Sequence, residues 1–129
     1  MSCSQISWLL MADAPKALAE FYGFAMNAQV RQGLNVSHWY VANLEGLRIE
    51  IFSPSRTRPR PCKGRGFSLC LKGKKSMKPL LEIKEWSSKL VARGAVLLEK
   101  PIVEDFGVES WLGDPEGNQF LIVVPSIDY

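Results

Sequence analysis

The chain repeats one of its own motifs, and this repeat constrains the fold more than any other feature of the sequence. Residues 114–126, D-P-E-G-N-Q-F-L-I-V-V-P-S, match residues 43–55, N-L-E-G-L-R-I-E-I-F-S-P-S, at a spacing of 71 positions. Each copy is a Glu-Gly turn followed by an apolar strand that ends in Pro-Ser. A chain of 129 residues has room for one core, or for two half-modules that share one. The repeat therefore predicts two related modules in a single domain, residues 1–129.

Hydrophobic patterning predicts the same element order, β-α-β-β-β, in both modules. In the first module, Asp13 is expected to cap a helix that Gly23 stops or bends. The strands of that module are expected over residues 6–12, 25–32, 37–42 and 47–53. In the second module, a helix is expected from Pro79 to Gly94. Its strands are expected over residues 67–72, 96–99, 108–112 and 118–124.

A segment rich in proline and basic residues separates the modules. Residues 54–66, P-S-R-T-R-P-R-P-C-K-G-R-G, contain three prolines, two glycines and five cations. Such a composition cannot form a helix or a central strand. The modules are therefore predicted over about residues 4–55 and 66–126, with residues 54–66 as the linker.

The basic residues are concentrated around this linker. Nine of the sixteen lie between residues 51 and 81, where no acidic residue occurs. Within residues 56–78 the only aromatic residue is Phe67, whereas nucleic-acid binding surfaces interleave cations with aromatic rings. Nucleic acid is therefore not expected as a partner. A solvated linker is the simplest interpretation; an anion-attracting rim or a contact to an acidic partner are alternatives.

The sequence also indicates where the protein works. No apolar run approaches the roughly 18 residues of a membrane span, and the first residues do not resemble a signal peptide. Cys3, Cys62 and Cys70 are an odd set without metal-type spacing, so free thiols are expected. We therefore expect a cytoplasmic protein without a membrane partner.

Three motifs, taken with the repeat, resemble the vicinal-oxygen-chelate superfamily. They are A-L-A-E-F-Y-G at residues 17–23, A-R-G-A at residues 92–95 and W-L-G-D-P-E-G-N-Q-F at residues 111–120. This superfamily contains glyoxalase I, extradiol dioxygenases, fosfomycin-modifying enzymes and bleomycin-resistance proteins. The resemblance covers Ile6 to Pro125. It implies an α+β fold of tandem βαβββ modules, whose mixed sheet forms a cup with helices outside, and it implies a homodimer.

The resemblance also implies where a metal would bind, and most of those ligands are absent here. Family enzymes place one ligand near the start of each module's first strand and one carboxylate in each last strand. The last-strand positions correspond to Glu50 and Leu121. The first-strand positions correspond to Ser7 or Trp8 and to Gly66 or Ser68. Because one carboxylate does not hold a catalytic divalent ion, we expect neither a metal nor another cofactor.

The single histidine, His38, has to be judged by the face of the sheet to which it points. Counting across the turn after residue 42 pairs Val41 with Arg48 and Trp39 with Glu50. This register places His38 on the face opposite Glu50. A hydrogen-bonded structural histidine is the expected role, and only a bulge would reverse it.

The same alternation predicts which side chains bind a ligand. In the first module Trp39, Val41, Arg48, Glu50 and Phe52 are expected to face the cup, with an ion pair between Arg48 and Glu50. In the second module the mostly apolar face is expected to include Gln119, Leu121 and Val123. An aromatic wall with few polar groups is typical of a small-molecule site. The alternative is that Glu50 is satisfied by Arg48 in a cup filled by side chains.

These residues support three functional hypotheses. The first is a metal-independent protein, related to glyoxalases and bleomycin-resistance proteins, that binds a small apolar or anionic organic ligand. The second is a glyoxalase-like lyase or isomerase with Glu50 as its catalytic general base. The third is a structural or regulatory partner protein that keeps the fold and lacks a pocket.

Overall fold

The computed structural model describes residues 7–43, 46–56 and 68–128. The chain divides into two compact units, residues 1–62 and 63–129, which we call the N-terminal and C-terminal units. Each unit is described by itself. Most of the predicted linker, residues 57–66, lies outside the described residues.

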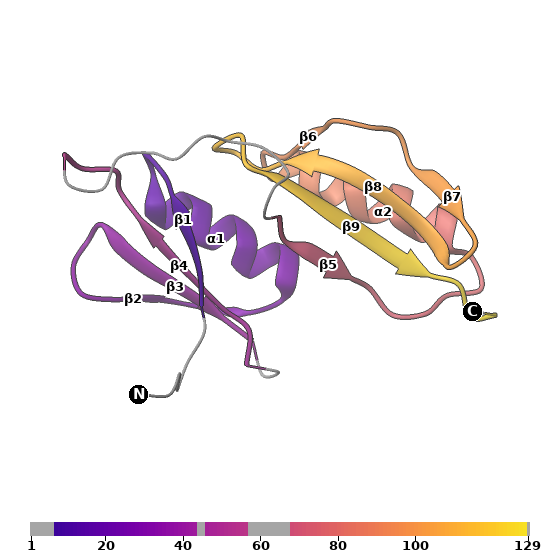
Figure 1. Ribbon diagram of the computed structural model, residues 1–129, viewed down its shortest axis with the longest axis horizontal. Coiled ribbons are helices and arrows are strands. Elements are labelled where there is room, and N and C mark those ends of the chain that lie inside the picture. Colours follow the sequence, from indigo (N-terminus) through magenta and orange to yellow (C-terminus); the bar gives the residue numbers. More distant parts are fainter. Residues whose placement is uncertain (1–6, 44–45, 57–67, 129) are drawn as a thin grey trace. The chain divides into compact units, whose positions relative to one another are not determined.

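The N-terminal unit has the predicted order β-α-β-β-β (Figure 1). Its elements are β1 (Trp8–Met11), α1 (Pro15–Met26), β2 (Gln29–Gln32), β3 (His38–Ala42) and β4 (Arg48–Phe52). The strands form one sheet in the order β1-β4-β3-β2. Strand β1 runs parallel to β4, and the other pairs are antiparallel.

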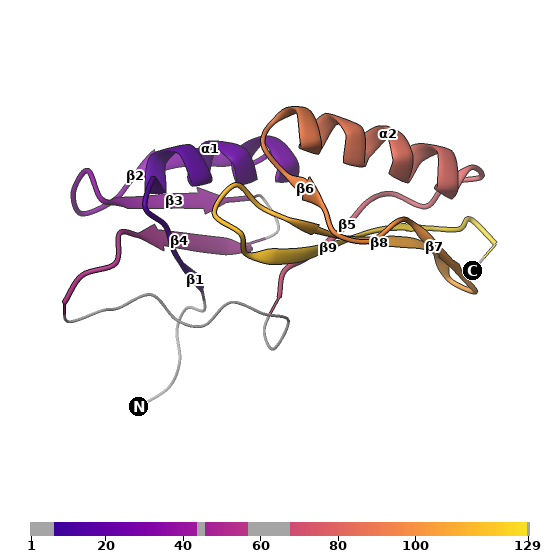
Figure 2. The ribbon, with the colours of Figure 1, turned by 90° about the horizontal axis from the view of Figure 1, so that it is seen from above.

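The helix α1 covers one face of this sheet, as the view from above shows (Figure 2). Leu18, Phe21 and Tyr22 recur at helical spacing and are buried. They pack over a sheet face on which Ile49 and Ile51 are fully buried. Alternation along β4 therefore leaves Glu50, between these two isoleucines, on the opposite face, and that face carries the candidate site.

Both ends of α1 differ from the prediction. The N-cap is Ala14 without a side-chain cap, and Pro15 occupies the first turn. The helix continues past Gly23 to Met26, and its C-cap Asn27 has a left-handed conformation with φ 49°. Gly23 serves a close approach instead, because a Cβ there would overlap Val30 of β2.

The C-terminal unit repeats this topology and adds one strand. Its elements are β5 (Cys70–Lys72), α2 (Pro79–Ala92), β6 (Val96–Leu97), β7 (Ile102–Glu104), β8 (Gly107–Gly113) and β9 (Gln119–Pro125). The sheet order is β5-β9-β8-β6, with β7 also pairing with β8. Strand β7 was not predicted, because three residues are too few to show a periodic pattern.

The core of the C-terminal unit lies between α2 and its sheet. Ile83 and Leu90 of α2 are fully buried, as are Phe120 and Ile122 of β9. The two units together confirm the predicted α+β class with mixed sheets and βαβββ modules. No helix in the described part of the chain is long and apolar enough to cross a membrane.

The repeat extends to the hydrogen bonds of the two turns. Asn43 pairs with Leu47 through its backbone N–H, and its Oδ1 accepts the Leu47 N–H at 3.0 Å. Asp114, at the matching position, bonds Asn118 through its backbone and its side chain. Both turns have a glycine in the left-handed region before the second strand, Gly46 with φ 90° and Gly117 with φ 86°.

Candidate functional site

The register between β3 and β4 differs by one residue from the prediction. Tyr40 lies opposite Glu50, Val41 opposite Ile49 and Trp39 opposite Ile51. Trp39 and Val41 therefore lie on the face opposite Glu50, and Val41 is fully buried there. The prediction that Trp39 and Val41 line the cup with Glu50 is wrong, because it rested on the wrong register.

The corrected register brings His38 to the face of Glu50. His38 lies opposite Phe52, two residues along β4 from Glu50. Its Nε2 is 3.1 Å from Glu50 Oε1. No bulge is needed for this contact, so the predicted parity of His38 is wrong. The imidazole is 2% exposed and the Glu50 side chain 24% exposed.

Ser7 supplies the second contact to Glu50. Its Oγ donates a hydrogen bond of 2.5 Å to Glu50 Oε2. Ser7 immediately precedes β1, which runs parallel to β4 with Leu9 opposite Glu50. Of the two first-strand alternatives, Ser7 is therefore the residue beside Glu50, while Trp8 is exposed.

The imidazole of His38 is held on all sides. Its Nδ1 accepts the Leu34 N–H at 3.0 Å, so in the neutral ring the proton lies on Nε2 and is donated to Glu50. The ring stacks on Phe52 with centroids 4.1 Å apart. Gly33 leaves room for it, because a Cβ at Gly33 would lie 2.5 Å from Nδ1.

These contacts keep Glu50 ionised. The hydrogen bond from Ser7 lowers the pKa of Glu50 below its ordinary value of 4.5, against the desolvation that raises it. The hydrogen bond from His38 and the charge of Arg48 lower this pKa further. At neutral pH the face therefore carries a fixed carboxylate between a hydroxyl and an imidazole.

Arg48 does not form the predicted ion pair with Glu50. Its guanidinium Cζ lies 3.8 Å from the centroid of the Tyr40 ring, which is a stacking contact. Among the described residues its Nε is buried without a hydrogen-bond partner. A buried unpaired polar group lowers the free energy of unfolding by about 1–3 kcal/mol, so this position of the guanidinium destabilises the fold. Arg48 and Tyr40 line a hollow of about 230 Å³ together with Arg31, Gln32 and Ala42.

The C-terminal unit holds an apolar version of the same site. Leu121 takes the place of Glu50, since Cys70 lies opposite Leu121 as Leu9 lies opposite Glu50. Ser68 is two residues before Cys70, so it matches Ser7. Its Oγ is buried and has no partner among the described residues, because no carboxylate faces it. The other alternative, Gly66, lies outside those residues.

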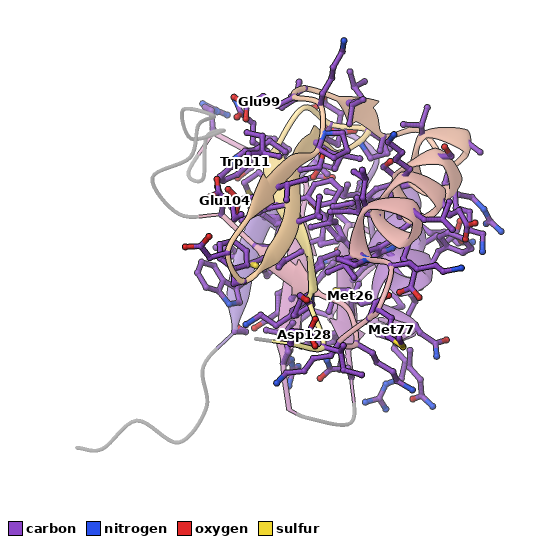
Figure 3. The ribbon with its side chains drawn as sticks, turned by 90° about the vertical axis from the view of Figure 1, so that its right-hand side faces the viewer. Met26, Met77, Glu99, Glu104, Trp111 and Asp128 are labelled. Atoms are coloured by element: carbon purple, nitrogen blue, oxygen red, sulfur yellow. The ribbon has the colours of Figure 1, made fainter. Side chains whose placement is uncertain are left out.

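The face of the C-terminal sheet opposite α2 includes the predicted residues Gln119 and Leu121. Leu121 lies opposite Trp111, and Figure 3 shows Trp111 on the side of β8 away from α2. Val123, on this face, borders a groove of about 680 Å³. The other residues that line the groove are Cys70, Lys72, Gly73, Lys75, Phe106 and Pro125. Burial raises the pKa of the Cys70 thiol above its ordinary 9.0, so the groove holds a protonated cysteine at neutral pH.

The donor atoms within the N-terminal unit do not fit a catalytic divalent metal. Glu50 and His38 are its two strong ligands at this site, and the His38 Nε2–H is donated to Glu50. Ser7 contributes a hydroxyl, which is a weak ligand when protonated. Within the described part of the chain, no three His, Cys, Asp or Glu side chains gather into a metal-binding group.

Comparisons with known proteins identify the fold. No family model matches the chain, and no curated protein matches it. Among solved structures, hypothetical protein SA1046 from S. aureus is 12% identical, with a TM-score of 0.76 over 96% of this chain and 95% of that one. A glyoxalase/bleomycin resistance protein/dioxygenase family enzyme from Burkholderia phytofirmans PsJN is 15% identical, with a TM-score of 0.72 over 92% and 97%. The fosfomycin resistance protein FosX from Listeria monocytogenes is 16% identical, with a TM-score of 0.67 over 99% and 95%.

At these identities the likeness shows the fold. The chain folds as the glyoxalase/bleomycin-resistance/dioxygenase proteins do. This confirms the fold that the resemblance of its motifs to the vicinal-oxygen-chelate superfamily implied.

Proposed function

We propose that this protein binds a small organic ligand on the Glu50 face of its N-terminal unit, without the help of a metal ion. The observation that supports this proposal is the hydrogen-bonded group of Ser7, His38 and Glu50. It combines an ionised carboxylate, an oriented imidazole and a hydroxyl beside the aromatic rings of Tyr40 and Phe52. Few polar groups on an aromatic wall are what a small-molecule site needs for orientation and affinity.

The fold itself does not require this polar group. Hydrophobic residues of similar volume usually stabilise a partly buried position at least as well as an ion pair does. The C-terminal unit illustrates this, because Leu121 occupies the place of Glu50 in the same topology. Retention of the carboxylate in one unit and not in the other therefore favours a role in binding.

An enzyme with Glu50 as its general base is the second candidate. The contact with His38 favours it, because an oriented carboxylate is a feature of acid–base sites. The pKa of Glu50 weighs against it, since a base that works at neutral pH has a pKa raised toward 7 and the pKa of Glu50 is lowered. We therefore prefer binding to catalysis.

A ligand screen on the Glu50→Gln variant tests this proposal. A library of small organic acids, alcohols and amines is titrated into the ¹⁵N-labelled protein and followed by NMR. We expect members that shift the amides of residues 38–52, with binding at least about tenfold weaker in Glu50→Gln and a melting temperature lowered by only a few degrees. Glu85→Gln, at an exposed position of α2, is the matched control and should bind as the wild type does.

Three results would contradict the proposal. If no library member shifts these amides, the protein is better described as a structural or regulatory partner. If Glu50→Gln loses most of its stability, the polar group is structural. If elemental analysis after dialysis finds about one Zn, Ni, Fe or Mn per chain, binding does involve a metal.

A further inference from the structure

Two arginines lie on the same sheet face as Glu50. Arg31 is opposite Tyr40 in the β2–β3 ladder, and Tyr40 is opposite Glu50 in the β3–β4 ladder. Arg48 shares this face because it is two residues before Glu50 on β4. Arg31 and Arg48 both line the hollow of about 230 Å³ described above.

Neither guanidinium group is satisfied by the described part of the chain. The Arg48 guanidinium lies over the Tyr40 ring, with its Cζ 3.8 Å from the ring centroid. This contact does not take up the N–H groups in conventional hydrogen bonds, so they remain for other partners. One of these groups, Nε, is buried without a hydrogen bond. Arg31 is exposed, and its side chain makes no hydrogen bond or ion pair with a described residue. Two fork-shaped donor groups therefore border one hollow.

We propose that this hollow binds the oxyanion of a small organic acid, a carboxylate or a phosphonate. The inference rests on the proposed function and gives the chemical class of its ligand. Arginine forks match such oxyanions with paired, charge-assisted hydrogen bonds. A hollow of about 230 Å³ is smaller than the roughly 300–1,000 Å³ of complete ligand sites, so it suits one head group.

The charges around the hollow favour an anion. Arg31 and Arg48 contribute two positive charges, and Glu50 is the acidic side chain on the same face. Glu50 already accepts hydrogen bonds from Ser7 and His38, which offset part of its charge. The remaining acceptor capacity of Glu50 suits a hydroxyl or an ammonium on the same ligand. The ligand class is therefore a short organic acid that also carries a hydrogen-bond donor.

An NMR titration with matched probes tests this inference. The probes are phenylphosphonate and benzoate as organic anions, benzyl alcohol as their neutral counterpart, and inorganic phosphate. Both organic anions should shift the amides of Arg31, Tyr40 and Arg48. In the double variant Arg31→Gln, Arg48→Gln they should bind at least about tenfold more weakly, because the charge-assisted bonds are lost. The double variant Lys84→Gln, Lys89→Gln, at exposed positions of α2, removes the same two charges and should bind them normally.

The variants separate this inference from the proposed function. Arg48→Lys should give intermediate binding, since it keeps the charge and loses the fork. Should the double variant fail to fold, Arg31→Gln alone carries the test, because Arg31 is exposed. The inference would be overturned if the organic anions bound equally well to the wild type and the variants. It would also be overturned if inorganic phosphate bound as tightly as the organic anions. If the inference failed in this way but benzyl alcohol still bound and its binding depended on Glu50, the proposed function would remain supported. If no probe and no library member binds, both fail.

Discussion

The acidity of Glu50 links the candidate site to the stability of the protein. Its pKa is lowered in the folded state, chiefly by the hydrogen bond from Ser7. A carboxyl group with a lowered folded pKa stabilises the protein above its ordinary pKa of 4.5. That contribution is lost as the pH falls through the folded value.

We therefore predict a pH-dependent difference between the wild type and Glu50→Gln. At pH 7 the wild type should be more stable by about 1 kcal/mol, because the variant loses charge-assisted hydrogen bonds. The difference should shrink as the pH falls below 4.5. Urea unfolding at several pH values from 7 to 3 measures it, and a difference that grows toward acid would contradict the assignment.

Gly33 is predicted to be essential for the position of His38. An alanine Cβ there would lie 2.5 Å from Nδ1 and 2.7 Å from Cε1 of His38, and the ring cannot retreat because Phe52 stacks on it. Gly33→Ala should therefore lose about 1–3 kcal/mol of stability and shift the His38 ring signals in NMR spectra. Gly73→Ala is the control, since its nearest atoms would be 3.6 Å away. Equal effects of the two substitutions would rule out the steric argument.

Some residues of the candidate site could be predicted from sequence. The resemblance to the vicinal-oxygen-chelate superfamily, aligned through the repeat, implied Glu50 and its counterpart Leu121 as site positions. It gave two alternatives for each first-strand position, and these included Ser7 and Ser68. His38 and Tyr40 were missed, because the face of a residue depends on the register of its strand, and a shift of one residue reverses every face.

At the scale of elements, the turn before β4 contained the signal that would have corrected this register. Asn43 and Leu47 close the turn, so three residues lie between them. Three-residue hairpin loops place a glycine in the left-handed region, and Gly46 has φ 90° at the last loop position. Counting from a three-residue loop pairs Tyr40 with Glu50. The motif N-L-E-G-L therefore specifies the register, whereas the apolar alternation of the two flanking strands alone does not.

The two turns provide a comparison of matched elements. The Asp114 side chain accepts three hydrogen bonds at 2.9 Å, from the backbone N–H groups of Glu116 and Asn118 and from the Asn118 amide. Asp114 is 2% exposed. In the first turn, Asn43 Oδ1 accepts one such bond, from Leu47.

Asp114→Ala should therefore cost more stability than Asn43→Ala. We expect a loss of about 2–4 kcal/mol for Asp114→Ala and about 1 kcal/mol for Asn43→Ala, since three bonds to a buried carboxylate are worth more than one bond to a half-buried neutral amide. Urea unfolding of both variants measures the difference. Equal losses would mean that the second turn does not depend on its carboxylate.

At the scale of the whole molecule, the repeat predicted two modules, because two copies of one motif indicate two copies of the same helix-covered sheet. Strand β7 was not predicted, because its three residues are too few to show an alternating pattern. The sequence left the expected ligand open between an apolar and an anionic molecule. The choice depends on which side chains share a face of the sheet, and that is set by strand register and not by composition. The corrected face brings together Arg31, Arg48 and Glu50, which are scattered in the sequence.

We also propose that the protein forms a homodimer, and the apolar surface of the C-terminal unit is the best candidate interface. Leu80, Leu81 and Val103 border an apolar groove of about 430 Å³ beside α2. Val103 is 68% exposed. Figure 3 shows the adjacent Glu104 pointing away from α2, so alternation turns Val103 toward it. An apolar surface of this kind is typical of a protein contact.

The dimer prediction can be tested by sedimentation velocity. At tens of micromolar the wild type should sediment as a dimer, and Val103→Lys should sediment as a monomer near 14.5 kDa, because a lysine in the apolar groove would be desolvated on association. Leu34→Lys is the matched control: Leu34 is 82% exposed in the N-terminal unit, outside the proposed interface, so this variant should remain a dimer. A wild type that sediments near 14.5 kDa would refute the homodimer, and dimers of both variants would place the interface elsewhere on the chain.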